Sequence, residues 1–228
     1  LATRNFYKGI IILERLQIDK NLMRGYNMLA NTLRETNSMV QSRQWYDKAL
    51  QLAREQNDSL GIASVYNNLG TLLRIQDQSD SAIYYFQSSL RLKRDNGQYK
   101  RIGNTHFNLG EIYIDIQKPD SALNHLYKSV KYRRLANDNF GLAHSYISLA
   151  KILITKGDLI KAKIQIELIK SRTILMSSKD LSLKLLEIER DYLLARGPFI
   201  QRAIILKKIH SLRTEILHKE KQEIISSY

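Results

Sequence analysis

Residues 61–82 read GIASVYNNLGTLLRIQDQSDSA, and residues 101–122 read RIGNTHFNLGEIYIDIQKPDSA. The second stretch begins 40 residues after the first (101 minus 61) and keeps Asn-Leu-Gly and Asp-Ser-Ala at the same places. The same register continues toward both ends of the chain, with Leu29 before these stretches and Leu149 after them. Self-similarity at a fixed period of this length is typical of proteins built from stacked structural repeats.

Each repeat contains two segments in which apolar residues have helical spacing. In the first quoted copy, Val65 and Leu69 fall on one face of a first helix, and Ala82 and Phe86 fall on one face of a second. The connection between them, residues 76–79, is short and polar, so the sequence predicts an antiparallel helical hairpin. A single hairpin cannot bury both of its faces. Neighbouring hairpins must therefore cover one another and form a solenoid.

Residues at the predicted helix ends and helix contacts agree with this hairpin. Gly157 suits the left-handed residue that ends a helix, and Pro119 suits the first turn of the helix that follows. Gly70 and Gly110 carry no side chain where the two helices of a hairpin meet. We expect the helices to approach closely at these glycines.

The composition supports a helical protein and excludes several classes of site. The 228 residues include only 10 Gly and 2 Pro, which argues against a β-sandwich, a β-barrel or a collagen-like chain. The absence of Cys excludes disulfides, thiolate metal sites and a cysteine nucleophile. No run of about 18 apolar residues occurs, so no membrane-spanning segment is predicted within residues 1–228.

The repeats resemble the tetratricopeptide repeat (TPR) family. The family pattern of an aromatic residue, Leu-Gly, Ala and a second aromatic residue is met by Tyr66, Leu69, Gly70, Ala82 and Phe86. The usual period of the family is about 34 residues, whereas the period here is 40 (101 minus 61), which implies longer helices. The resemblance implies an all-α fold, a right-handed α-solenoid of antiparallel helical hairpins.

The repeat register predicts the boundaries of the parts of the chain. Residues 1–17 are expected to form the second helix of a truncated repeat, and residues 178–228 a diverged fifth repeat with a C-terminal capping or linker helix. The TPR-like region between them, residues 19–171, divides into four repeats at about 19–56, 58–96, 98–136 and 138–171.

The C-terminal part carries a second resemblance. Residues 192–228 are similar to the end of the repeat region in Bacteroidota sensor proteins, where a helix leads to a transmembrane segment and an output domain. This implies the sensing or docking region of a bacterial signal-transduction protein, periplasmic or otherwise extracytoplasmic, with membrane contact only through segments outside residues 1–228. A cytoplasmic location is the alternative. The last helix would serve a homodimer or a conformational relay, or it would simply cap the solenoid through Ile205 and Ile209.

The TPR resemblance also assigns a binding surface, because the first helices of TPR repeats line a concave groove. An amide side chain offers both a donor and an acceptor to an extended peptide backbone, so this surface implies a protein or peptide partner. The alternative is a solvated polar face on which Asn68 and Asn108 bond between helices. Carried over position by position, the partner-binding residues are Asn27, Asn31, Arg34, Asn67, Asn68, Thr71, Arg74, Asn104, Phe107, Asn108, Glu111, His144 and Lys151, with Arg24 and Ser64 on the same surface.

The chain is strongly basic, with 36 Lys and Arg against 22 Asp and Glu and a formal net charge of +14. The densest basic clusters, residues 91–94 and 131–134, share one register near the end of a second helix. Cations at that place complement the helix dipole, so the charge has a structural explanation. A basic solenoid that binds nucleic acid or anionic lipid is the alternative, although no nucleic-acid-binding motif accompanies the clusters.

Catalytic and metal-binding patterns do not occur in the sequence. It contains no His-Glu-x-x-His, no phosphate-binding glycine loop and no Gly-x-Ser-x-Gly, and its five His have no spacing typical of metal ligands. The sequence therefore predicts a non-enzymatic protein-interaction module without catalytic residues, metal or cofactor. A dimerising or relay scaffold that precedes a membrane segment is the alternative from another functional class.

Overall fold

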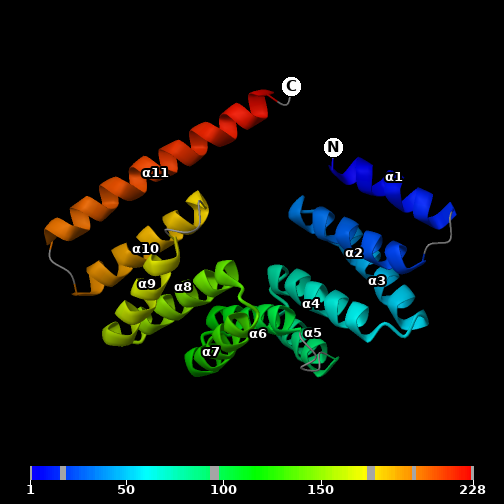
Figure 1. Cartoon of the computed structure of the whole chain (residues 1–228), viewed down its shortest axis with the longest axis horizontal. Helices are drawn as coiled ribbons and strands as arrows, with labels where there is room; N and C mark the ends of the chain where they lie inside the picture. Colours follow the sequence, from blue (N-terminus) through cyan, green and yellow to red (C-terminus); the bar gives the residue numbers. More distant parts are fainter. Residues whose placement is uncertain (1, 16–18, 93–97, 174–177, 197–198, 227–228) are drawn as a thin grey trace. The chain divides into compact units, whose positions relative to one another are not determined.

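The computed structural model describes residues 2–15, 19–92, 98–173, 178–196 and 199–226, and these residues form helices joined by short turns, without strands. Figure 1 shows the order of the helices along the chain. Their bounds are α1 (Ala2–Arg15), α2 (Asp19–Glu35), α3 (Met39–Glu55), α4 (Ser59–Ile75), α5 (Ser79–Leu92), α6 (Tyr99–Asp115), α7 (Pro119–Leu135), α8 (Asn139–Thr155), α9 (Leu159–Thr173), α10 (Lys179–Arg196) and α11 (Phe199–Ser226).

The chain divides into two compact units. The first, Leu1–Ile116, contains α1 to α6, and the second, Gln117–Tyr228, contains α7 to α11. Within the first unit, α2 packs on α3 and α4 packs on α5 as hairpins, and α2 contacts α4, which contacts α6. Within the second unit, α8 packs on α7 and α9, and α10 packs on α8, α9 and α11.

One type of turn ends most of the described helices. Asn37, whose N–H bonds to the Arg34 carbonyl at 3.1 Å, has a positive φ, and the next N–H, of Ser38, bonds to the Leu33 carbonyl at 2.8 Å. This is a Schellman C-cap. The left-handed residues recur at intervals of 20 or 40: Asn37, Asn57, Asp77, Gln117, Asn137 and Gly157. Two equal halves of 20 residues explain the period of 40. Among these residues, only Gly157 was predicted from the sequence.

Hairpin packing in the first unit depends on small residues. Tyr46, Leu69 and Phe86 are fully buried, and they form the centre of the core. At Gly70 an added Cβ would lie 2.8 Å from the ring of Phe86, so the predicted close approach is confirmed there. At Ala30 the backbone carbonyl accepts a 2.8 Å hydrogen bond from the buried Ser42 hydroxyl. Both contacts hold the second helix of a hairpin against the first.

The helix starts follow the expected chemistry. Asp58 caps α4 by accepting hydrogen bonds from the N–H groups of Leu60 at 3.1 Å and Gly61 at 2.9 Å. Asp138 caps α8 in the same way, with a 3.2 Å bond from Gly141. Pro119 lies in the first turn of α7, as predicted.

The last helix is paired with its neighbour in the second unit. α11 packs on α10 and buries Ile205 and Ile209. An ion pair of 2.6 Å joins Lys179 to Glu215 across the two helices. The inward side of α11 therefore completes a helical hairpin.

Candidate functional site

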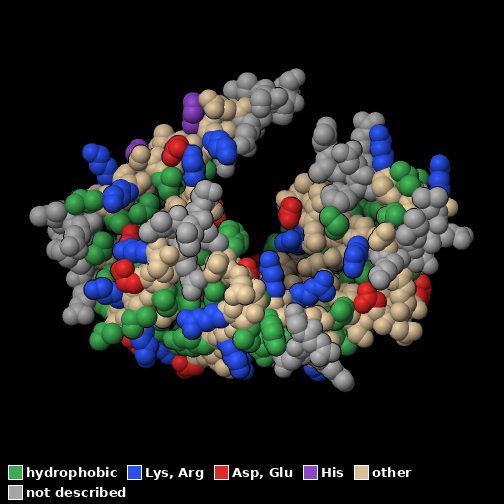
Figure 2. Space-filling model, in the orientation of Figure 1, with side chains coloured by type: hydrophobic (Ala, Val, Ile, Leu, Met, Phe, Trp, Pro, Cys, Tyr) green, Lys and Arg blue, Asp and Glu red, His purple; other side chains and the backbone are tan. Residues whose placement is uncertain are grey.

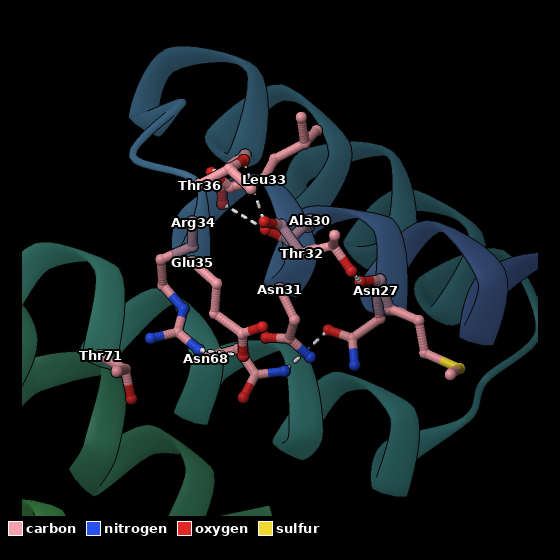
Figure 3. A network of polar contacts seen from close by, with 12 residues as sticks. Asn27, Ala30, Asn31, Thr32, Leu33, Arg34, Glu35, Thr36, Asn68 and Thr71 are labelled. Carbon is pink, nitrogen blue, oxygen red and sulfur yellow. Dashed lines mark hydrogen bonds and ion pairs between the residues drawn. The ribbon is translucent and has the colours of Figure 1, made fainter. Parts of the chain in front are cut away.

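The predicted asparagines lie where α2, α4 and α6 meet in the first unit, and they bond to one another. The Asn68 amide donates to the Asn27 side-chain oxygen at 2.9 Å, and Figure 3 shows this bond between α4 and α2. One repeat later, the Asn108 amide donates to the Asn67 oxygen at 3.4 Å. The Thr105 hydroxyl also donates to Asn67, at 2.9 Å. These amides therefore hold the first helices of adjacent repeats together.

Asn31 and Arg34 lie beside the first asparagine pair. The hydroxyl of the buried Tyr46 donates to the Asn31 oxygen at 2.6 Å, and burial raises the pKa of this tyrosine above its usual value of 10.0. Figure 3 shows Asn31, Arg34 and Asn68 with their polar ends directed toward one region. Arg34 contacts Glu35 at 3.8 Å. Its Nε is buried and makes no hydrogen bond among the described residues.

Arg74 is the cation of the next repeat, and acidic groups from α6 face it. Its Nε lies 2.6 Å from the Asp115 carboxylate, and a second guanidinium nitrogen lies 3.8 Å from Glu111. The charge of this arginine is thus largely compensated. Thr71 donates to the Asn67 carbonyl at 3.1 Å within its own helix. Asn104 and Phe107 are half-buried on α6.

The remaining predicted residues lie in the second unit, on α8. His144 is half-buried and packs on Phe140 with ring centroids 4.8 Å apart. Burial, with nearby Lys184 and Arg133, lowers the pKa of this histidine below its usual 6.5. Lys151 is exposed. The predicted site residues are thus divided between the two units, and those of the first unit lie on α2, α4 and α6, of which α2 contacts α4 and α4 contacts α6.

A pocket of about 820 Å³ opens at the start of the same face in the first unit. Its lining combines apolar side chains from α2 and α4 with two arginines, the α4 cap Asp58 and several amide or hydroxyl groups. The Gln56 side-chain nitrogen is buried without a hydrogen-bond partner among the described residues. The lining residues are Met23, Arg24, Asn27, Met28, Gln56, Asp58, Leu60, Gly61, Ser64 and Arg101.

Only part of this pocket was predicted from the sequence. Asn27, Arg24 and Ser64 occupy groove positions of the TPR pattern, so the resemblance identified them. Gln56 and Leu60 come from a turn and from the first helical residues after it, which lie outside that pattern. The repeated left-handed turn, with Asn57 at its centre, is the signal that would have placed them beside the groove.

The basic cluster at residues 131–134 is partly internal. Arg133 is only 5% exposed, donates to the Gly141 carbonyl and to the Ser145 hydroxyl, and lies 3.9 Å from Asp138. Arg134 donates to the Tyr146 hydroxyl at 2.8 Å. On the face in Figure 2, Lys and Arg side chains are scattered over both units among other residue types. These contacts favour the structural explanation of the cluster.

The described residues offer neither a metal cluster nor a membrane span. In the parts of the chain that the structure describes, no group of three or more His, Asp or Glu side chains is arranged to hold a metal ion. Among those same helices, none combines the length and hydropathy that crossing a membrane requires.

Comparison with known proteins identifies the repeat. The sequence model of the tetratricopeptide repeat matches residues 21–95. A search of the curated proteins gives no significant match.

Solved structures with this architecture are numerous. The crystal structure of BtubC (BKLC) from P. vanneervenii superposes with a TM-score of 0.81 at 16% identity, covering 94% of this chain and 90% of that one. TPR-like repeats of a Podospora anserina kinesin light chain give 0.68 at 11% identity, covering 86% and 96%. YrrB, described as a TPR protein with an unusual peptide-binding site, gives 0.51 at 20% identity, covering 85% and 96%.

These likenesses concern the fold, and they confirm the predicted all-α solenoid of helical hairpins. Residues 21–95 are therefore identified as tetratricopeptide repeats by their sequence, and the chain as a whole has the fold of a tetratricopeptide repeat solenoid.

Proposed function

We propose that the chain is a non-enzymatic module that binds a segment of a partner protein on the face built by α2, α4 and α6. TPR folds are typical of protein and peptide interaction. The observation that carries the proposal is the pocket of about 820 Å³ on that face. Its volume lies in the range of small-molecule and peptide side-chain pockets.

The pocket has the chemistry of a peptide subsite. Met23, Met28 and Leu60 supply flexible apolar contacts for a large side chain. The buried nitrogen of Gln56 offers a donor to a peptide carbonyl. Arg24 and Arg101 favour an acidic group beside the apolar one. We therefore expect the bound segment to combine acidic and large apolar residues.

The asparagine pairs leave capacity for a ligand although they bond to each other. Each amide has two N–H donors and an oxygen with two lone pairs, and the bond between Asn68 and Asn27 uses one donor and one lone pair. The remaining groups border the pocket at Asn27. YrrB, a similar fold, is described as having a peptide-binding site of its own. That description supports a peptide as the ligand class.

A peptide selection tests the proposal while the partner is still unidentified. Random peptides displayed on phage are selected on the purified chain, and the affinity of the enriched peptides is measured by fluorescence anisotropy. Arg24→Glu reverses one pocket charge, and Ser64→Trp fills the pocket with a bulky ring. We expect each to weaken binding at least about tenfold, a free-energy change of about 1.4 kcal/mol.

Matched variants outside the pocket provide the control. Lys8→Glu makes the same kind of charge change at an exposed position of α1, and Ser81→Trp adds the same ring at an exposed position of α5. Both should bind the selected peptides like the wild-type chain. Peptides that bind all four variants equally well would show that the pocket is not the docking site.

We also propose a biological role for this binding module. We infer that docking serves bacterial signal transduction, on the resemblance of residues 192–228 to the repeat ends of Bacteroidota sensors. The repeat boundaries at 19–56, 58–96, 98–136 and 138–171 are proposed with it. The homodimer through the C-terminal helix stays a prediction, since no observation tests it. Ile205 and Ile209 of that helix are buried, and α11 packs on α10.

A further inference from the structure

The outer face of α9 carries an apolar stripe in the second unit. Ile160 is 73% exposed and Ile164 is 52% exposed, and the half-buried Leu168 continues the stripe one turn further. A hollow of about 740 Å³ lies along this stripe, and Tyr192 of α10 closes one side of it. Large apolar side chains at consecutive turns in water are a feature of interaction surfaces.

The repeat register shows that the fold does not require this stripe. The corresponding residues of α7, 40 positions earlier, are Asp120, Asn124 and Lys128, and all three are exposed polar groups. In α5, 80 positions earlier, they are Asp80, Tyr84 and Ser88. A second helix of this solenoid therefore tolerates polar residues at all three places. The apolar residues of α9 need another explanation.

Charges beside the stripe are arranged along the helix by sign. Lys163 lies one turn before Glu167, and both border the hollow. The Glu167 side chain is 57% exposed, and its contact with Lys170 is 3.4 Å, longer than the 2.5 Å between Lys170 and Glu189. A basic position is thus followed by an acidic one on the same face. When a second copy of the helix runs in the opposite direction, its acidic position faces the basic position of the first copy, and its basic position faces the acidic one.

We propose that this face binds α9 of a second copy of the chain in antiparallel orientation about a two-fold axis near Ile164. In that arrangement Ile164 meets Ile164 of the partner subunit, and Ile160 meets Leu168 of the partner subunit. Lys163 then faces Glu167 of the partner subunit, and the two-fold axis repeats the pair. Interfaces of this isologous kind require a self-complementary patch, which the order of the charges supplies.

The contact is small, so the dimer forms with modest affinity. One helix face buries less area than the standard interface of about 1,600 Å². Sedimentation velocity of the whole chain, from low to high micromolar concentration, should show a shift from monomer to dimer. Ile160→Glu and Ile164→Glu should abolish that shift. A wild-type chain that stays monomeric throughout overturns the proposal.

The repeat provides matched controls for these variants. Val40 is 74% exposed at the position of α3 that corresponds to Ile160, and Tyr84 is 61% exposed at the position of α5 that corresponds to Ile164. Val40→Glu and Tyr84→Glu should leave the dimer unchanged, and circular dichroism establishes that all four variants fold. Loss of the dimer in the control variants as well would place the contact elsewhere and overturn the proposal.

A charge exchange separates a second copy from an unrelated partner. Lys163→Glu alone brings like charges together twice and should weaken the dimer about tenfold or more. Adding Glu167→Lys in the same chain restores opposite charges only when the two copies pair antiparallel. Recovery of the dimer in the double variant supports the proposal. A double variant that is no better than the single one overturns it.

Discussion

The side-chain amide of Asn68 donates a 2.9 Å hydrogen bond to the side-chain oxygen of Asn27, 41 residues earlier in the chain. Asn108 and Asn67 are also 41 residues apart, and their amides repeat the bond at 3.4 Å. Both pairs connect the first helix of one repeat to the first helix of the next. The two asparagine pairs therefore stabilise the stacking of adjacent repeats. The first pair also borders, at Asn27, the pocket that we propose as the peptide subsite.

Removing the donors of both pairs should lower the stability of the first unit. Asn68→Ala and Asn108→Ala each delete a half-buried hydrogen bond, which contributes about 0.5–1.5 kcal/mol to the free energy of unfolding. Urea denaturation followed by circular dichroism measures the loss. Asn124→Ala, at an exposed position of α7, is the control and should change stability little. Equal midpoints for all three variants would show that the bonds do not stabilise the stack.

The fold could be predicted because several independent features of the sequence indicate the same repeated hairpin. The apolar spacing, the glycine at Gly70 and the Leu-Gly pattern each require a helical hairpin with a close contact. The turns were harder to predict. Asn37, Asp77 and Gln117 adopt left-handed conformations that favour glycine. The identity of these side chains does not predict a positive φ. Only the recurrence of the turn every 20 residues reveals its type.

The site was predictable only in outline. TPR positions identified which side chains leave the first helices on the groove side. They could not tell whether an amide faces a ligand or the next helix, because Asn can do both. Nor could they reveal that Glu111 and Asp115 compensate Arg74. Charge compensation depends on distances across repeats that a single sequence does not contain.

Substitution of Gly70 tests the close contact within a hairpin. A Cβ at this position would lie 2.8 Å from the Phe86 ring, which is fully buried and cannot move away freely. Gly70→Ala should therefore destabilise the chain by about 1–3 kcal/mol, as overpacking does. Gly9→Ala is the opposite case, because nothing lies within 4 Å and alanine favours the helix. Thermal melts should move in opposite directions, and a stabilising Gly70→Ala would contradict the packing.

The left-handed turns can be tested by exchanging glycine and glutamine between two of them. Gln117 has φ 55° and Gly157 has φ 77° at corresponding helix ends. A side chain in this conformation costs about 1 kcal/mol. Gln117→Gly should stabilise the chain by roughly 0.5–1 kcal/mol after the entropy of glycine is counted, and Gly157→Gln should destabilise it similarly. Gln87→Gly, at an exposed position inside α5, should destabilise the chain. A destabilising Gln117→Gly would argue against the turn assignment.

The two aspartate caps should differ in their contribution to stability. Asp58 and Asp138 cap equivalent helices, but Asp138 also lies 3.9 Å from the buried Arg133, whereas a buried Ala53 stands at the position equivalent to Arg133. Asp58→Ala removes a cap, at a cost of about 1 kcal/mol. Asp138→Ala also leaves a buried cation with one fewer partner, so we expect a loss of about 3 kcal/mol or more. Urea midpoints compare the two. Equal losses would mean that the ion pair contributes nothing.

Acidification should destabilise the second unit through His144. Burial, then Lys184 and Arg133, lowers the pKa of this histidine in the folded chain below the 6.5 expected when unfolded. Between those two pKa values the unfolded chain binds a proton that the folded chain does not, so stability falls as pH drops below about 6.5. His125, whose pKa is lowered by burial and Lys128, acts in the same direction.

Single substitutions separate the two histidines. His144→Gln should make the dependence of the urea midpoint on pH shallower between about pH 7.5 and about pH 5.5, because the titrating group is gone. His125→Gln should remove a separate part of the same dependence. His210→Gln, at an exposed position of α11, serves as the control. If His144→Gln and the control give the same pH profile as the wild-type chain, protonation of His144 does not determine acid stability.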